Sequence, residues 1–294
     1  MIEQALYEHL KSQMSLSPFL ATYNGSPAVF NQEAPADRDG GWGQGPQYGR
    51  VVFSVNMEGD PERCMGGVLA VDSLCKEGEQ VPEQMEPVIR DLIHGWFFSK
   101  GTFTVAAQWK NSDYFTEIKD HVIGCTSSFN LLGFPVLTTS EPDVVRRINT
   151  WTSQRFENLH VINHDPLPST AWKPTGDESA VYWRLLTDGP AKWIPDTFQT
   201  IWRTATLKCH IFSKDNASAA AVARSITTAL YADKRMMKDG ESPIMVNRAN
   251  TVDLGADPLR TGQLTVEATY GIIVNFENEK SIQNIKYNDE KGDI

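Results

Sequence analysis

A strict alternation of apolar residues near the end of the chain constrains the fold more than any other pattern. The apolar positions recur at every second residue: Leu264, Val266, Ala268, Tyr270, Ile272, Val274 and Phe276. A period of two is that of a β-strand with one buried face. Segment 201–212 has the same period, with Ala205, Leu207, Cys209 and Ile211 on one face. Such strands predict antiparallel sheets that bury one face against a core.

Helical periods lie between these strands. Apolar residues at a spacing of four, from Ile2 to Met14, predict a helix over 2–14. Asp215-Asn216 supplies an N-cap for an Ala-rich helix over 218–231. Further helices are expected at 60–75, 88–98 and 144–156, and further strands at 51–55, 103–109, 114–118, 122–129, 181–186, 244–246 and 252–254. This mixture predicts an α+β fold, with antiparallel sheets and helices packed on one face.

The length of 294 residues suggests two domains. Both halves run through a helix, a long loop, a strand, a helix and a pair of strands, which predicts two related modules. In this interpretation, strand 51–55 and helix 64–75 correspond to 203–212 and 218–231, and 114–129 corresponds to 252–276. The predicted division is an N-terminal module over 1–140 with a long loop over 17–50, a C-terminal module over 141–276 and a polar tail over 277–294.

Charge and composition exclude several classes of protein. The 27 basic and 37 acidic residues give a formal net charge of −10, which argues against a protein that grips nucleic acid. Because the sequence has no run of 18 apolar residues, we expect no membrane-spanning helix. The acidic start predicts no secretory signal. Four cysteines without a C-x-x-C pair are typical of reduced, buried thiols in a protein folded in a cytoplasm.

The sequence contains residues that occur in catalytic and ligand-binding motifs, but their spacing does not match those motifs. The glycines between 40 and 49 lack the register of a dinucleotide-binding loop, and no Lys-Ser or Lys-Thr follows them as in a P-loop. His160 and His164 lie in a loop sequence, and Cys209 and His210 point to opposite faces of a strand. We therefore expect no enzyme, no cofactor and no metal site. An enzyme whose active site leaves no linear signature is the alternative.

Large aromatic residues stand in Pro- and Gly-rich stretches. A structureless loop as long as 17–50 is usually functional, and aromatic side chains are enriched at protein–protein contacts. The candidates for a subunit interface are Trp42, Tyr48 and Arg38 in the first loop, and Trp172 and Trp193 in later ones.

Several of these segments together resemble the tail terminator proteins of tailed bacteriophages, also called tail completion or neck proteins. The segments are the N-terminal helix 2–10, the loop with Ala34-Pro35, the strand 50–55, the segment 205–212, the Ala-rich helix and the strand 264–274. Members of that family are usually single modules of about half this length, so this chain departs from the family in its doubled module.

The resemblance implies a structural virion protein without catalytic residues, assembled in the host cytoplasm. Such a protein forms a ring, typically a hexamer, on the last ring of the tail tube and joins it to a head-completion or neck protein. The doubled module makes a trimer the alternative. DNA passes through the lumen without specific binding, and acidic walls would favour that. Another head–tail joining component or a tail-tube component is the alternative within the structural class.

Overall fold

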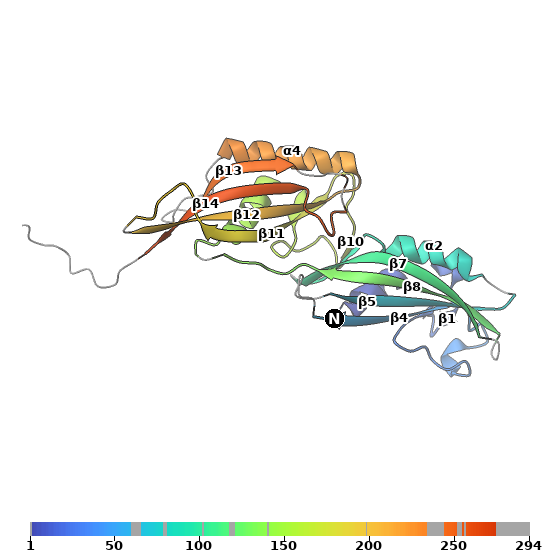
Figure 1. Ribbon diagram of the computed structural model, residues 1–294. Helices are drawn as coiled ribbons and strands as arrows, with labels where there is room; N and C mark the ends of the chain where they lie inside the picture. Colours follow the sequence, from blue (N-terminus) through green and yellow to red (C-terminus); the bar gives the residue numbers. More distant parts are fainter. Residues whose placement is uncertain are drawn as a thin grey trace, which may run out of the picture.

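The computed structural model describes residues 2–59, 66–78, 81–101, 103–117, 121–139, 141–197, 199–233, 244–251, 255 and 257–274. Two β-sheets, each with helices on one face, follow each other along an elongated molecule (Figure 1). The α+β fold that the sequence predicts is confirmed.

The first unit is built on a sheet with the strand order β10-β6-β7-β8-β5-β4-β3. Its strands are β3 (Val29–Asn31), β4 (Arg50–Glu58), β5 (Gly66–Lys76), β6 (Phe97–Lys100), β7 (Phe103–Glu117), β8 (Val122–Gly133) and β10 (Ala171–Trp172). Helices α1 (Glu3–Lys11) and α2 (Pro82–Ile93) pack on one face. The loop before β4 carries the small hairpin of β1 (Thr22–Tyr23) and β2 (Ser26–Pro27), and short 3-10 helices at Ser17–Phe19 and Gly40–Trp42.

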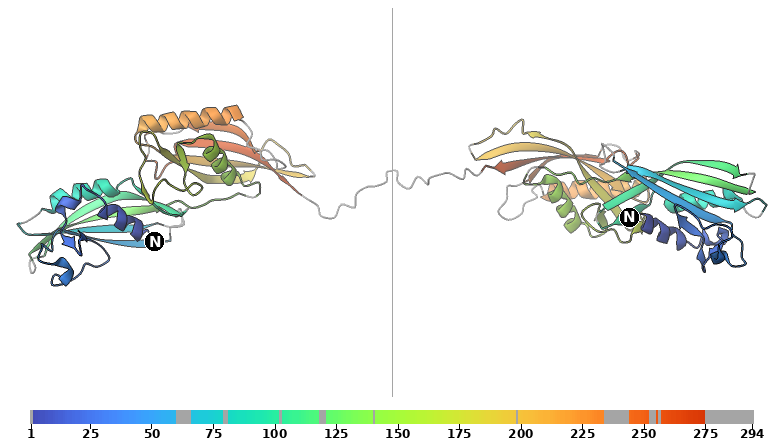
Figure 2. Two further views of the ribbon diagram at one scale, coloured as in Figure 1. Left: turned by 180° about the vertical axis from the view of Figure 1, so that it is seen from behind. Right: turned by 90° about the horizontal axis from the view of Figure 1, so that it is seen from below.

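The second unit is built on a sheet with the order β13-β14-β12-β11-β9. Its strands are β9 (Leu159–Val161), β11 (Ser179–Pro190), β12 (Thr200–Phe212), β13 (Ile244–Thr251) and β14 (Leu264–Ile273). Helices α3 (Val144–Arg155) and α4 (Asn216–Asp233) cover one face (Figures 1 and 2). The β10 segment is sequence from between β9 and β11, yet it pairs with β6 of the first sheet.

The two units share one topology. In each, a helix precedes a short strand that runs parallel to the next one, β3 to β4 and β9 to β11. An antiparallel hairpin follows, then a helix, then a second hairpin whose last strand pairs with the first hairpin. Thus β4 and β5 correspond to β11 and β12, α2 to α4, and β7 and β8 to β13 and β14.

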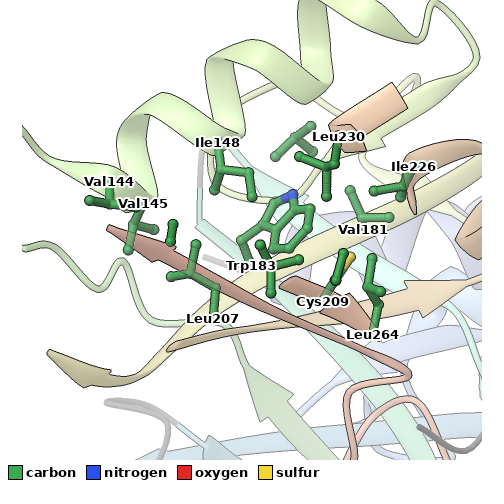
Figure 3. Close-up of a cluster of buried hydrophobic side chains, with 14 of the residues drawn as sticks. Val144, Val145, Ile148, Val181, Trp183, Leu207, Cys209, Ile226, Leu230 and Leu264 are labelled. Atoms are coloured by element: carbon green, nitrogen blue, oxygen red, sulfur yellow. The ribbon is translucent and has the colours of Figure 1, made fainter. Parts of the chain in front are cut away.

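Each core lies between the sheet and its helices. In the second unit Trp183 is buried at the centre, and its indole nitrogen donates to Thr152 Oγ1 at 3.1 Å (Figure 3). Residues of α3, α4 and the strands surround it, among them Ile148, Leu207 and Leu230. The corresponding core of the first unit joins α1 and α2 to the sheet through residues such as Leu6, Ile89 and Phe129.

The expected helix over 60–75 is wrong, because 66–76 forms strand β5. Its buried residues alternate, with Leu69, Val71 and Cys75 inside, and this period of two is masked by the apolar neighbours Val68 and Ala70. The predicted correspondence of that segment with α4 is therefore also wrong, since the true counterpart of α4 is α2. The predicted match of strand 51–55 with 203–212 is wrong as well, because β4 corresponds to β11 and β12 to β5.

Other boundaries also differ from expectation. Helix α2 begins at Pro82, so Pro87 lies inside it and not at its first turn. The strands expected at 103–109 and 114–118 form the single strand β7, which a bulge between Trp109 and Asn111 accommodates. The strand expected at 252–254, the end of the one at 264–276, and the tail over 277–294 fall outside the described residues.

Candidate interaction surfaces

Each sheet has a face opposite its helices, which we call the helix-free face, and two ends. The first-hairpin end is where β4–β5 or β11–β12 turns and β8 or β14 finishes. The second-hairpin end is where β7–β8 or β13–β14 turns. Because the units share a topology, these ends can be compared directly.

The units join through unlike ends. The first-hairpin end of the first sheet packs on the second-hairpin end of the second sheet, and both contribute their helix-free faces. The alternation shows this, because Phe98 and Val181 point into the helix-side cores while their neighbours Phe97 and Tyr182 lie in the junction. The buried junction residues are Phe97, Ala106, Phe134, Ile162, Trp172, Ala180, Tyr182, Phe212 and Leu259.

Phe134, the first residue after β8, is the hub of this junction. Its ring stacks on Phe97 at 5.9 Å and meets Tyr182 and Phe212 edge-on at 5.2 and 5.7 Å. Aromatic pairs in this range add to the energy of area burial. Trp172, a predicted subunit-interface residue, is 5% exposed and packs against Phe97 in the same cluster. Trp172 therefore packs at the junction between the two units of one chain.

Polar contacts fix the junction. The hydroxyl of Tyr182 donates to the carbonyl of Pro135 at 2.7 Å in a buried position. At the surface, Gln108 Nε2 donates to Asp257 Oδ2 at 2.7 Å. Lys173 Nζ donates to the carbonyl of His94, and burial together with this cation lowers the pKa of His94. The units are held by aromatic packing, hydrogen bonds and the β10–β6 pairing together.

In the first unit, the loop before β4 packs on the β3–β4 side of the helix-free face at the second-hairpin end. Lys76, opposite the first residue of β8, places its ammonium 5.3 Å from the ring of Tyr48. Arg50 stacks its guanidinium on the same ring at 4.4 Å and pairs with Asp37 at 2.9 Å. Tyr48 is consequently buried, at 8% exposure.

Trp42 holds this loop together. It is 3% exposed and packs against Tyr23 and Phe30 at ring distances of 5.0 and 5.8 Å. Its indole nitrogen donates to the carbonyl of Ala36 at 3.0 Å. Asp39 accepts from the Gly41 amide and the Tyr23 hydroxyl, and these bonds lower the pKa of that carboxyl. Trp42 is thus packed inside the loop, whereas Arg38 is exposed on the surface of the same loop.

The first-hairpin end of the second unit is open. Trp193, in the loop between β11 and β12, is 92% exposed, and Ile201 and Ile273 are 39% and 55% exposed. Ile273 ends β14 on the helix-free face, where the first unit places Phe134. A groove of about 820 Å³ lies on this part of the second unit, and it is lined by the loop 187–194 and by Thr204, Thr206, Asn247, Glu267 and Thr269.

The exposed loop is braced. Asp188 accepts from the Tyr270 hydroxyl at 2.8 Å and from Arg203 Nε at 3.0 Å. Burial, with this carboxylate beside it, raises the pKa of Tyr270 to about 12. Asp196 accepts from the backbone amide of Trp202 at 2.7 Å on the far side of the turn. The chain therefore fixes both arms of the loop that displays Trp193.

The described residues contain thiols and titratable side chains, but these do not form a cluster of metal ligands. Within the described ranges, no three His, Cys, Asp or Glu side chains gather as a metal site would require. Cys75, Cys125 and Cys209 are buried free thiols, and burial raises the pKa of Cys75 to about 11. None of the helices in the described part of the chain has the length and apolarity to cross a membrane.

The fold thus defines a tandem of two α+β modules of one topology, joined through unlike ends. No protein-family model and no curated protein matches the sequence. Among solved structures, the chain is similar to a component of the virion of a native gene transfer agent particle, at 15% identity and a TM-score of 0.33. The match covers 44% of this chain and 90% of that chain. A score this low does not establish a common fold.

Sequence reasoning missed the junction residues, although a signal was present. Strands buried on both faces lose their alternation. Adjacent buried pairs mark such places: Phe97-Phe98, Ala106-Ala107 and Ile211-Phe212.

Proposed function

We propose that this protein is a structural component of a phage-like virion, a tail terminator that forms a ring on the tail tube and joins it to the head or neck. The contact between unlike ends of two similar modules carries the proposal. A contact of this kind is heterologous, and when it repeats between subunits it generates a ring if the rotation closes. The open apolar end around Trp193 offers a surface for the next contact.

The ring would be a hexamer of chains, or a trimer in which six modules surround the lumen. The second arrangement follows if modules in neighbouring chains meet as the two modules of one chain do. A net charge of −10 suits a ring that DNA passes through without being held. We accordingly expect no retention of duplex DNA at physiological salt in a gel-shift measurement.

Native mass spectrometry and negative-stain imaging test this function. The purified chain is measured alone and after co-expression with the products of genes that flank its own. Closed rings of three or six chains, seated on one end of a tube, are the expected result. A subunit that stays monomeric in both preparations, or that binds along the whole tube, contradicts the terminator role. Binding along the tube would instead assign a tail-tube role.

A further inference from the structure

We propose that Trp193 at the open end of one copy inserts into a glycine-lined hollow on the loop-covered end of a second copy. The proposal rests on the proposed ring and identifies the two surfaces that build it. The hollow measures about 440 Å³ and lies against Trp42, with Leu20, Gly40, Gly43, Gly45 and Pro46 in its wall. This volume is within the range of sites that enclose small molecules.

Continuity with the internal junction is the first argument. Inside the chain, a first-hairpin end meets a second-hairpin end through helix-free faces. The ends left over are the first-hairpin end of the second unit and the second-hairpin end of the first unit. They lie at opposite extremities of the molecule (Figures 1 and 2). A second copy placed head to tail would bring together the same two kinds of end.

The chemistry of the open end is the second argument. Trp193 is almost fully exposed, although Trp is the residue type most enriched at binding hot spots. The hydrogen bonds of Asp188 and Asp196 fix the strands on either side of its loop. A loop whose two arms are held in position before binding loses less freedom when it binds.

The glycines of the hollow are the third argument. Gly40 has an ordinary φ, and a Cβ added there would meet nothing within 4 Å. Gly45 likewise has an ordinary φ, and its nearest neighbour is the Trp42 carbonyl oxygen at a normal contact of 3.7 Å. The space above both glycines is therefore open, and a larger side chain at either position would fill part of the hollow without disturbing the subunit.

Arg38 adds a charge contact beside the hollow. Its neighbours Asp37 and Asp39 are engaged by Arg50 and by Gly41 with Tyr23. Within the described residues, the exposed Arg38 guanidinium has neither a hydrogen bond nor an ion pair. A guanidinium near the face of an indole ring contributes a cation–π attraction.

The test compares W193A and G40L with two matched controls, M14A at another highly exposed apolar residue and G176L at another glycine with open space around it. Subunit association is measured by sedimentation velocity and native mass spectrometry. We expect each test variant to raise the dissociation constant at least about 30-fold, which is the effect of losing a hot spot. The controls should change it less than about threefold.

Mixing the two variants gives the sharper result. W193A retains the hollow and G40L retains the indole, so a head-to-tail contact predicts 1:1 heterodimers that do not extend further. Heterodimers fail to form if Trp193 instead meets Trp193 in a two-fold contact, and this would overturn the proposal. Deletion of residues 275–294 gives a further test. If this deletion strengthens subunit association while W193A leaves the dissociation constant unchanged, the open end binds that segment, and the proposal is overturned.

Failure of this proposal differs from failure of the proposed function. Closed rings that persist in W193A and G40L would leave the terminator role standing and reject the docking assignment. Heterodimers from the mixture, with open filaments from the wild type, would support the docking and reject the ring.

Discussion

The two units have one topology, yet corresponding ends of the two sheets differ in what covers them. At the second-hairpin end, the helix-free face of the second unit is buried by the neighbouring sheet, whereas in the first unit the chain's own loop packs on Phe30, Arg50 and Lys76 at one side of the sheet. At the first-hairpin end, the helix-free face is buried in the first unit and open in the second. Backbone topology therefore sets which surfaces can be covered, and side chains decide what covers them.

The residues at corresponding places show this directly. Phe134 follows β8 and lies 6% exposed in the junction, whereas Ile273 ends β14 on the same face at 55% exposure. Trp42 and Trp193, which lie at unlike ends of the molecule, form a second contrast, because one is packed inside its loop and the other is left outside, at 3% and 92% exposure. These pairs give matched variants that differ chiefly in burial.

The largest effect is expected for Phe134→Ala. Removing a buried aromatic ring leaves a cavity and costs about 4 kcal/mol, here at the contact that couples the units. Calorimetry should show the unfolding of the two units separating into two transitions. Ile273→Ala, the matched control, should change the free energy of unfolding by less than about 0.5 kcal/mol. Equal losses would show that the open end is covered in solution.

Trp42→Ala should cost about 3 kcal/mol in the first unit, because the indole packs Tyr23 and Phe30 and anchors the Ala36 carbonyl. Urea unfolding followed by circular dichroism checks this. Trp193→Ala, measured at a concentration where the protein is monomeric, should be nearly neutral. A neutral Trp42→Ala would mean that the loop is loosely held and that Trp42 is available to a partner, as its loop position alone suggested.

Sequence patterns gave the type of fold because most strands bury one face only. The strand over 201–212 and helices α3 and α4 lie within two residues of the predicted bounds. The prediction for the segment that forms strand β5 was wrong because apolar residues on the second face of the strand hide the period of two. The same cause hid the junction, where Phe97 and Phe98 are buried on opposite sides of one sheet.

The candidate surface was only partly predictable. Composition singled out aromatic residues in loops, but their exposure depends on tertiary packing that composition does not encode. Trp42 and Trp193 have similar Gly- and Pro-rich neighbourhoods in sequence, and opposite burial in the fold. That Gly40 and Gly45 line a hollow with open space above them depends on the fold and is not visible in the glycine-rich sequence.

A pH effect should distinguish the first unit through His9 on α1. Burial lowers the pKa of His9, opposed in part by its hydrogen bond to the Leu92 carbonyl. The folded state therefore prefers the neutral ring. Stability is complete above the unfolded pKa of about 6.5 and falls as the pH drops below it, by at most about 1.4 kcal/mol per pH unit.

The measurement for His9 is urea unfolding at pH 7 and pH 5, in the wild type and in His9→Gln. The difference between wild type and variant should shrink as the pH falls, because only the wild type must bury an ionisable ring. A difference that is constant with pH would show that other groups govern the acid sensitivity.

The smallest effect concerns the helix that opens each unit. Asp143 caps α3, accepting from the amides of Val145 and Arg146 at 3.0 and 3.1 Å, whereas Ile2, the N-cap residue of α1, makes no side-chain hydrogen bond. Asp143→Ala should therefore cost about 1 kcal/mol in the second unit. Asp143→Asn keeps the acceptor and should recover most of this in urea unfolding. If Asn is as damaging as Ala, the carboxylate charge at the helix N-terminus, and not the cap geometry, distinguishes α3 from α1.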